Sequence, residues 1–213
     1  LDPSPSIAAD GTVYVGSRFG KVYALSPIDG TKNWEYDTGQ AGAIESAPAI
    51  GTDGAIYFGQ WGGGIYALNP DGTRKWEYMA GGMEQRSGPA IGADGTIYIG
   101  MWDDKVYALD GLTGAKKWEY QTNGLVDSSP AIGSDGILYF GSYDGKVYAV
   151  HSSSTGLANS PWPKFGHNNL NTGKAVNWPK LGLVPGAAED RVSAKQLAQP
   201  DAPVPADKKV LMA

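Results

Sequence analysis

The chain has 213 residues, a formal net charge of −5 and a pI near 5.0, so it lacks the basic surface expected of a nucleic-acid-binding protein. Cysteine is absent, which excludes disulfides, thiolate metal sites and cysteine nucleophiles, and no apolar run reaches the length of a transmembrane segment. Glycine (31), tyrosine (12) and tryptophan (7) are abundant, and only 18% of residues are charged. This composition favours short aromatic strands joined by tight turns.

One unit of about 41 residues recurs four times along the chain. A landmark proline and a landmark glycine each recur with steps of 43, 41 and 41 residues, and three tryptophans stand 42 residues apart. The landmarks are Pro5, Pro48, Pro89 and Pro130; Gly16, Gly59, Gly100 and Gly141; and Trp34, Trp76 and Trp118. Such a period indicates stacked copies of one supersecondary unit.

Each unit divides into four short apolar runs, which in the third copy are residues 89–92, 96–101, 105–110 and 116–122. They are rich in Ile, Val, Tyr and Trp and are separated by Gly, Asp or Asn, which predicts four antiparallel strands. The first gap is Asp-Gly in every copy, at positions 10–11, 53–54, 94–95 and 135–136. Tight-hairpin geometry accounts for these aspartates without a calcium site.

The second and third runs are apolar at consecutive positions, as in Ile97-Tyr98-Ile99 and Val106-Tyr107-Ala108-Leu109. Consecutive residues of a strand point to opposite faces, so these sheets are expected to be covered on both sides. Neighbouring blades of a β-propeller provide such cover.

The third gap carries the most specific pattern, Ala108-x-Asp110-x-x-Thr113-Gly114-x-x-x-Trp118. It resembles the tryptophan-docking motif of quinoprotein-type β-propellers, which are built of pyrroloquinoline-quinone-like repeats. In that family the tryptophan of each blade packs against a neighbouring blade. The first two copies vary the pattern: Ala24, Ser26, Asp29, Gly30 and Trp34 in the first, and Ala67, Asn69, Asp71, Gly72 and Trp76, with a turn one residue shorter, in the second. The resemblance covers roughly Pro5 to Trp162.

We therefore expect an all-β propeller of four four-stranded antiparallel blades over residues 1–173. The blades are expected at about 2–40, 45–81, 86–123 and 127–165, with a closing segment to 173. Residues 174–213 form an Ala/Pro-rich tail or linker, with a short helix around 187–197. In the fourth copy, Ser152 to Thr155 replace the tight turn, and Trp162 stands where the docking tryptophan belongs.

Four blades leave the completion of the ring open. The resemblance implies rings of seven or eight blades, and an open half-ring leaves two apolar faces bare, which a soluble monomer rarely tolerates. Either the four blades close on themselves, or two chains pair into an eight-bladed homodimer, or the chain is part of a longer protein.

The repeat register aligns two sets of candidate binding residues on one face. The turns between second and third strands carry aromatic residues, and the positions three before each landmark proline carry mainly acidic ones. These are Phe19, Trp61, Trp102 and Tyr143, and Asp2, Glu45, Arg86 and Asp127. An aromatic rim around an acidic channel mouth suits a sugar, a peptide or a cationic group. The alternative is that the aromatic residues pack on neighbouring blades and the charges are solvated.

Catalytic and metal sites have little support in the sequence. The two histidines, His151 and His167, both lie in the irregular closing region, where a lone histidine is usually exposed or caps a turn. The Gly-rich stretch 61–64 opens a strand rather than a helix, so it does not predict a phosphate loop.

Three functions remain for comparison. The first is a non-catalytic binding or scaffold propeller without a cofactor, like the family's outer-membrane assembly lipoproteins, with a protein or small ligand on the loop face. The second is a dehydrogenase that uses pyrroloquinoline quinone with calcium, although many such members place the quinone under a vicinal disulfide that this chain cannot form. The third is a glycan-binding surface protein. We predict the first, with the periplasmic or extracellular location that the resemblance implies.

Overall fold

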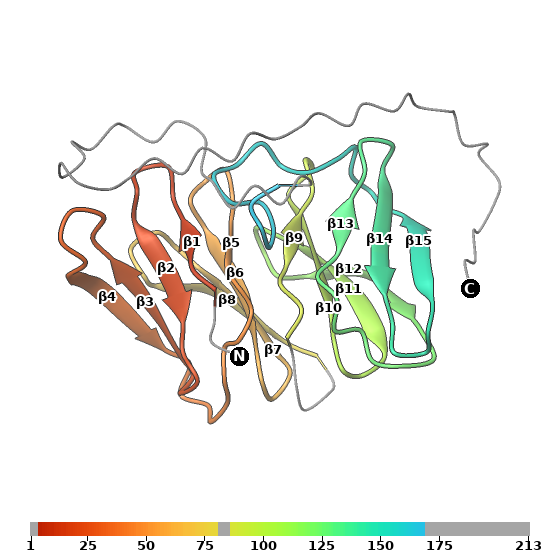
Figure 1. The fold of residues 1–213 in the computed structure, drawn as a ribbon, viewed down its shortest axis with the longest axis horizontal. Coiled ribbons are helices and arrows are strands. Elements are labelled where there is room, and N and C mark those ends of the chain that lie inside the picture. The colour runs from red at the N-terminus through yellow and green to blue at the C-terminus, as the bar shows by residue number, and fades with distance from the viewer. Residues whose placement is uncertain (1–3, 81–85, 169–213) are drawn as a thin grey trace, which may run out of the picture.

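The computed structural model describes residues 4–80 and 86–168, and in these residues the protein is all-β (Figure 1). The strands form four antiparallel sheets in chain order, which we call blades 1 to 4. Blade 1 holds β1 (Ser6–Ile7), β2 (Val13–Gly16), β3 (Lys21–Leu25) and β4 (Lys32–Asp37). Blade 2 holds β5 (Ala49–Ile50), β6 (Ile56–Gln60), β7 (Gly64–Leu68) and β8 (Arg74–Met79). Blade 3 holds β9 (Ala90–Ile91), β10 (Thr96–Gly100), β11 (Lys105–Asp110) and β12 (Lys116–Gln121). Blade 4 holds β13 (Ala131–Ile132), β14 (Ile137–Gly141) and β15 (Val147–His151).

The Asp-Gly dipeptides form the first hairpin turn of each blade, as their composition predicts. In blade 3, Asp94 Oδ1 accepts the backbone N–H of Thr96 at 3.1 Å, and Gly95 adopts a φ of +78° that favours glycine. The same bond from the residue two positions after the aspartate recurs in the other blades, at Thr12, Ala55 and Ile137. The turns fix the register of β9 against β10, so the apolar residues of every blade fall in equivalent places.

Blades 1 to 3 each pack one face on the blade that follows in the chain. We call this face, and the equivalent face of blade 4, the leading face, and we call the opposite one the trailing face. In blade 3 the leading face contains Ala90, Tyr98, Val106 and Ala108, and the trailing face contains Ile91, Ile97, Ile99, Tyr107 and Leu109. Three buried clusters fill the three junctions between consecutive blades. The core therefore lies between the sheets, which explains the consecutive apolar residues of β6, β10 and β11.

The fourth-strand tryptophans cross two of these junctions. Trp34 Nε1 donates to the carbonyl of Pro70 at 3.0 Å, and Trp76 Nε1 donates to the carbonyl of Gly111 at 2.9 Å. Both acceptors lie in the turn between the third and fourth strands of the next blade. The two indoles cover a glycine of that turn: a Cβ at Gly72 would lie 2.7 Å from Trp34 Cδ2, and one at Gly114 would lie 2.7 Å from Trp76 Cδ2. Only glycine fits beneath either ring.

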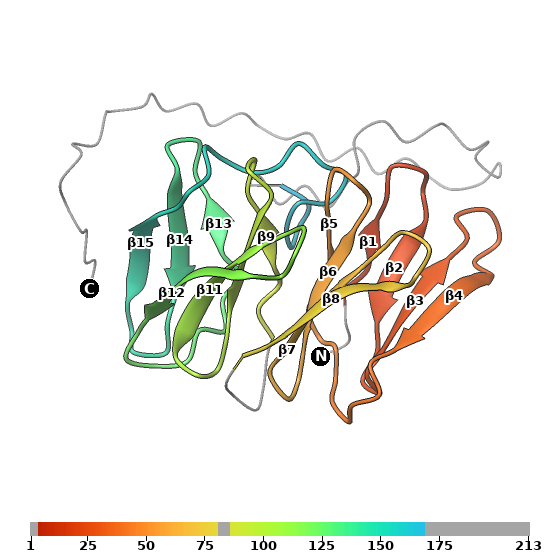
Figure 2. The ribbon, with the colours of Figure 1, turned by 180° about the vertical axis from the view of Figure 1, so that it is seen from behind.

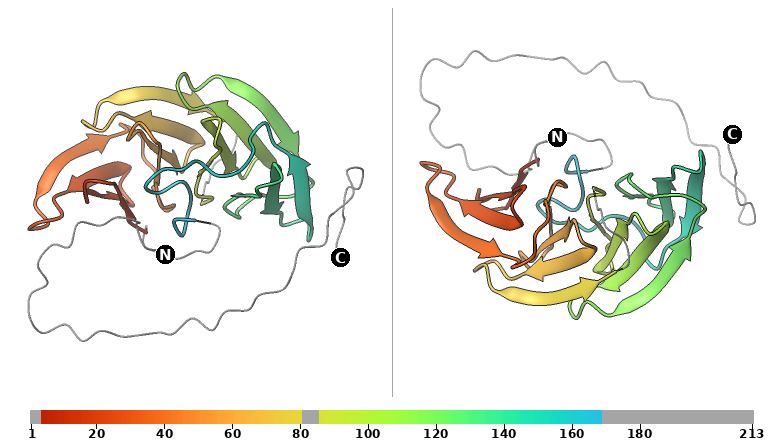
Figure 3. Two further views of the ribbon diagram at one scale, coloured as in Figure 1. Left: turned by 90° about the horizontal axis from the view of Figure 1, so that it is seen from above. Right: turned by 90° about the horizontal axis from the view of Figure 1, so that it is seen from below.

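The four blades form an open arc with blade 1 and blade 4 at its two ends (Figure 3). The view from behind shows the same order of blades, with the fourth-strand side of blades 1 to 3 toward the viewer (Figure 2). The described residues thus do not adopt the arrangement in which four blades close on themselves. Completion of the ring by a second chain stays a prediction.

Blade 4 differs from the expected four-stranded blade, because its sheet has only three strands within residues 4–80 and 86–168. The prediction that Trp162 takes the place of a fourth-strand tryptophan is wrong. Trp162 instead forms a β-bridge with Ile50 of β5 and is buried against blades 1 and 2. The reason lies in Ser152 to Thr155, which replace the tight turn, so the chain leaves the sheet after β15.

Residues 152–168 run along the edge of the blades where the first hairpins lie, shown in blue tones in Figure 1. The segment bonds to the first strands of the two central blades: the Ile50 N–H donates to the Trp162 carbonyl at 2.7 Å, and the Ile91 N–H donates to the Pro163 carbonyl at 2.8 Å. These bonds join blades 2 and 3 at the concave side. The expected tail from residue 174 onward and the last residues of the closing segment lie outside the described residues.

Candidate binding face

The opposite edge of the blades holds the candidate binding residues. Two kinds of loop meet there: the turns between second and third strands, and the loops that link one blade to the next (Figure 1). The structure describes seven of the eight predicted residues, and Asp2 lies outside the described part of the chain. The seven described residues all lie in loops at this edge of the blades, and their role in binding stays a prediction.

Arg86 lies at the centre of this face, at the end of the loop before blade 3. Its Nε is 3.1 Å from Glu45 Oε2, and its Cζ lies 5.7 Å from the centre of the Trp61 ring and 5.1 Å from that of Trp102. A guanidinium between two indole faces is held by cation–π attraction as well as by the ion pair. Trp102 Nε1 in turn donates to Asp127 Oδ1 at 2.9 Å.

Five predicted residues thus form one connected set, which we call the Arg86 cluster: Glu45, Trp61, Arg86, Trp102 and Asp127. It joins the turns of blades 2 and 3 to the loops that precede blades 2, 3 and 4. The repeat register aligns the positions within the aromatic series and within the charged series. It does not predict that side chains of the two series contact each other. Arg86 is the single cation among the aligned acidic positions, and it is the residue that makes the connection.

Phe19 and Tyr143 lie apart from the Arg86 cluster, in the turns of the two end blades. Their exposed fractions are 85% and 67%, whereas Trp61 and Trp102 are half-buried. The aromatic series is therefore packed in the centre of the arc and exposed at both ends. Tyr143 is held in place through its backbone, because its N–H donates to the Leu125 carbonyl at 2.9 Å.

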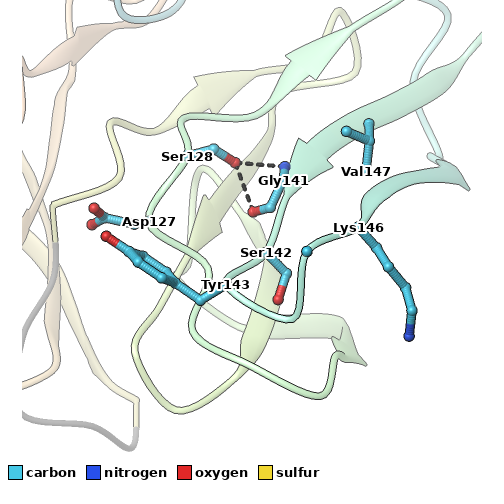
Figure 4. Close-up of a pocket in the computed structure, with 8 residues that line it drawn as sticks. Asp127, Ser128, Gly141, Ser142, Tyr143, Lys146 and Val147 are labelled. Carbon is cyan, nitrogen blue, oxygen red and sulfur yellow. Dashed lines mark hydrogen bonds between the residues drawn. The ribbon is translucent and has the colours of Figure 1, made fainter. Parts of the chain in front are cut away.

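A pocket of about 470 Å³ lies beside Tyr143 at the end of the arc. Figure 4 shows Asp127 and Tyr143 on one side of it and Val147 and Lys146 on the other. Ser128 forms its inner wall: its Oγ donates to the Gly141 carbonyl at 3.0 Å and accepts the Gly141 N–H at 2.7 Å. The pocket belongs to the leading face of blade 4, because it includes residues of β14 and β15.

Gln60 is a residue of this face that the sequence reading missed. It is buried, and its Nε2 donates to the carbonyls of Gln40 and Gly42 at 3.0 and 3.2 Å, which ties down the loop before blade 2. Its position directly after the landmark glycine is Ser17, Met101 or Ser142 in the other blades. In the sequence, the amide side chain at this position is the only feature that distinguishes Gln60 from its counterparts.

A second cavity, of about 430 Å³, lies at the opposite edge between blades 2 and 3. Three aspartates line it, but each is already used: Asp53 pairs with Lys75 at 2.7 Å, Asp94 accepts the Thr96 hydroxyl at 2.7 Å, and Asp110 accepts the Thr113 hydroxyl at 3.0 Å. Their carboxylates cap turns and balance lysines. These contacts account for the cavity's acidic residues without a ligand.

The described residues can be compared with the ligand set that a quinone–calcium site would need. No group of three or more His, Asp or Glu side chains converges in residues 4–80 and 86–168, whereas calcium at a quinone would need several oxygen ligands. The described residues therefore do not provide the carboxylate ligands of a quinone–calcium site. His167 is buried beside Trp162, with ring centres 5.2 Å apart, and burial lowers the pKa of its imidazole. Of the two expected roles for a loop histidine, exposure does not apply to His167, whose backbone N–H instead closes a turn by donating to the Lys164 carbonyl at 2.9 Å.

Comparison with solved structures shows the same architecture elsewhere. BamB from Moraxella catarrhalis is 27% identical with a TM-score of 0.61, and the match covers 72% of this chain and 47% of that one. A chain of a mitotic checkpoint complex is 17% identical with a TM-score of 0.61, over 70% of this chain and 47% of that one, which shows the fold alone. The chain thus spans about half the length of either structure.

A comparison with curated proteins gave no match. Within the part of the chain that the structure describes, no helix has the length and apolar character needed to cross a membrane. A family model described as outer membrane protein assembly factor BamB matches residues 1–176. Together with the four antiparallel blades and the pyrroloquinoline-quinone-like repeat, this match shows that the chain belongs to the BamB family of β-propellers.

Proposed function

We propose that this protein is a non-catalytic scaffold propeller that binds protein segments through the loop face containing the Arg86 cluster. The observation that carries the proposal is the connection of five side chains from three blades into one set, held by an ion pair, two cation–π contacts and an indole hydrogen bond. Such a set presents fixed aromatic and acidic groups at no further ordering cost. Membership of the BamB family supports a role in protein interaction.

The chemistry of the face favours an extended peptide segment as the ligand. Aromatic side chains from all four blades follow the arc, with Phe19 and Tyr143 exposed at its ends and the Arg86 cluster between them. Rings supply apolar area, and Glu45 and Asp127 supply hydrogen-bond acceptors that direct a peptide backbone or a basic side chain. A segment of an outer-membrane protein, or of a partner in its assembly, fits the description of the family.

We also propose two properties that follow from the family. The first is an exported, periplasmic location, where outer-membrane proteins pass before assembly. The second is that Trp34 and Trp76 act as the docking tryptophans of the repeat, which their bonds to the turn of the following blade support. Binding through the loop face requires no redox cofactor, and we propose that the protein works without one.

Site-specific photocrosslinking tests the loop face. A photoreactive phenylalanine placed at Phe19 or Tyr143 replaces an exposed aromatic residue and leaves the Arg86 cluster intact. The matched control is Leu112, which is 71% exposed but lies in the turn between β11 and β12, on the other side of blade 3. In Gram-negative cells that export the full chain, we expect adducts with an outer-membrane protein or a component of its assembly from positions 19 and 143 only.

Equal crosslinking from Leu112, or adducts that survive the Trp102→Ala change unaltered at both test positions, would contradict the proposed face. Binding of sugars is the second candidate, because exposed aromatic residues also stack on sugar rings. A panel of oligosaccharides that quenches tryptophan fluorescence in the wild-type chain but not in Trp61→Phe/Trp102→Phe would favour that candidate instead.

A further inference from the structure

The closing segment contains a five-residue motif that recurs sixteen residues later in the chain. The first copy is Trp162-Pro163-Lys164-Phe165-Gly166, and the second copy is Trp178-Pro179-Lys180-Leu181-Gly182. With 7 tryptophans and 14 prolines in 213 residues, a chance recurrence of Trp-Pro-Lys over so short a distance is rare. Only the first copy lies in the described part of the chain, so its contacts indicate what the second copy is able to bind.

The first copy binds the inner strands of two neighbouring blades. The Trp162 carbonyl accepts the N–H of Ile50 in β5 at 2.7 Å. The Pro163 carbonyl accepts the N–H of Ile91 in β9 at 2.8 Å. The Trp162 side chain is buried in the cluster that fills the junction between blades 1 and 2, which also contains Ile50 and Tyr14. The motif thus holds the segment on the blades by placing an indole in a junction.

The next junction, between blades 2 and 3, receives a much smaller side chain from the same segment. The cluster that fills it includes Ala158, together with Tyr57 and Ile91. These two residues occupy the places in the repeat that Tyr14 and Ile50 occupy beside Trp162. Tyr57, Ile91 and Ala158 also line the cavity of about 430 Å³. The second junction therefore has open volume beside the counterparts of the residues that Trp162 covers in the first.

The rim of this cavity carries an exposed apolar side chain and an excess of negative charge. Leu112 lies there and is 71% exposed. Three carboxylates of the rim share two ammonium groups, those of Asp53, Asp94 and Asp110 with those of Lys75 and Lys117. The aspartates need no ligand for their own bonds, but three negative charges against two positive ones favour a further cation beside the apolar wall. A tryptophan closely followed by a lysine has this chemistry.

The second copy of the motif is close enough in the chain to reach the cavity. The described residues end at Asn168, whose carbonyl lies 3.4 Å from Lys164 Nζ. The neighbouring Pro163 is bonded to Ile91 of the cavity wall. Nine residues, 169–177, separate Asn168 from Trp178. A chain of that length spans up to about 30 Å when extended, so the second copy can reach the cavity.

We propose that residues 178–182 dock in the cavity between blades 2 and 3, with the Trp178 indole against Tyr57 and Ile91 and the Lys180 ammonium at the acidic rim. The second copy of the motif then fills this junction as Trp162 fills the junction between blades 1 and 2. The contact lies on the edge of the blades opposite the Arg86 cluster. It is therefore independent of the function proposed for the loop face.

A double-mutant cycle on the full chain tests this contact. We expect Trp178→Ala to lower the thermal midpoint by about 2 °C or more, because it removes an indole from the cavity. This effect should be smaller by about 1 °C or more in a Leu112→Ala background, since residues in contact are energetically coupled. The matched control background is Ile28→Ala: Ile28 is 80% exposed and stands two positions before Gly30, as Leu112 stands two positions before Gly114.

In the Ile28→Ala background, Trp178→Ala should keep its full effect. An unchanged midpoint with Trp178→Ala in the wild-type chain would overturn the proposal. The same outcome follows if its effect is equal in the wild-type, Leu112→Ala and Ile28→Ala backgrounds, because Leu112 would then have no contact with Trp178.

Intramolecular photocrosslinking provides the second measurement. A photoreactive phenylalanine at position 112 should form links to the tryptic peptide 175–180, which contains Trp178, and the same group at position 28 should not. A mixture of isotope-labelled and unlabelled chains separates links within one chain from links between two. Links only between chains would show that the segment of a second copy occupies the cavity, and would overturn the proposed occupant. Equal links from both positions, or none from position 112, would also count against the proposal.

Discussion

Arg86 lies with its guanidinium carbon 5.1 Å from the centre of the Trp102 ring, so a residue from a linking loop is held by a residue from a hairpin turn. The two belong to different series of the repeat, and Glu45 on the other side of Arg86 belongs to blade 2. The loops of the face therefore depend on one another for their positions.

Removing this cation is expected to weaken the centre of the face. Arg86→Ala deletes two cation–π contacts and leaves Glu45, whose side chain is 12% exposed, without this ion pair. We expect a loss of about 1–2 kcal/mol in the free energy of unfolding, measured by urea denaturation. Arg74→Ala is the control, because the Arg74–Glu77 pair is largely exposed and its removal should cost less than about 0.5 kcal/mol. Equal losses in the two variants would show that Arg86 adds no more stability than an exposed ion pair does.

The junction tryptophan of blade 2 is expected to be a major source of stability. Trp76 is buried, and its ring packs on Gly114 while its Nε1 donates to Gly111. Trp76→Ala should destabilise by about 3–5 kcal/mol, because it empties a packed site and leaves a buried carbonyl with one bond fewer. Trp76→Phe retains most of the apolar area and should cost less. A loss below 1 kcal/mol in the alanine variant would contradict the importance of this contact.

Two glycines with the same φ allow the cost of a steric contact to be measured separately from the cost of backbone strain. Gly30 and Gly114 both have a φ of +73°, but only Gly114 lies beneath an indole. Gly30→Ala should cost only the strain of a left-handed alanine, about 1 kcal/mol, because no described atom lies within 4 Å of the added Cβ. Gly114→Ala should cost about 1–3 kcal/mol more, because the ring must move. Calorimetry of the two variants side by side measures the difference. Equal losses of stability would mean that the Trp76 ring moves aside at no measurable cost.

Stability is expected to fall in mild acid through His167. Burial lowers the pKa of this histidine in the folded state, so below its ordinary pKa of 6.5 the unfolded chain takes up a proton that the folded chain resists. The folded state is therefore disfavoured as the pH falls below about 6.5, and the free energy of unfolding should decrease from pH 7 toward pH 5.5. Denaturation at several pH values should give a shallower slope for His167→Gln than for the wild-type chain, and equal slopes would contradict this role of His167.

The quinone alternative makes a separate prediction. The described residues contain no group of three or more His, Asp or Glu side chains that could hold calcium, and the chain has no cysteine for a vicinal disulfide. Titration with pyrroloquinoline quinone and calcium should leave tryptophan fluorescence unchanged beyond the inner-filter effect measured with free tryptophan. Saturable quenching that requires calcium would restore the dehydrogenase-like alternative.

Much of the fold follows from the sequence because the repeat supplies several independent landmarks. The runs expected in the third copy at 96–101 and 105–110 correspond to β10 at Thr96–Gly100 and β11 at Lys105–Asp110. The turn chemistry of Asp94-Gly95 and the apolar residues on both faces of β10 are local properties, and local properties can be read from one sequence.

The closing region could not be predicted in the same way. Trp162 has the right residue type and nearly the right spacing for a fourth-strand tryptophan, yet it bridges to Ile50 far back in the chain. The position of Trp162 depends on its long-range contact with Ile50, which forms after the repeat has ended. The 41-residue period of the sequence gives no information about such a contact. His167 is buried by the same segment. For the binding face, the register places Arg86 and Trp102 at one edge, but their contact depends on side-chain directions that the pattern does not encode.

The outer strands of blades 1 to 3 share a feature with a consequence for handling the protein. β4, β8 and β12 carry alternating charges on their exposed positions, including the pairs Lys32–Glu35, Arg74–Glu77 and Lys116–Glu119. Charged side chains on an edge strand keep foreign strands from adding to the sheet. Within the described part of the chain, blade 4 ends instead at β15, whose five residues, Val147–His151, include no Asp, Glu, Lys or Arg. That edge is the place where unwanted aggregation of this chain would begin, and a lysine there would be the first change for keeping concentrated samples clear.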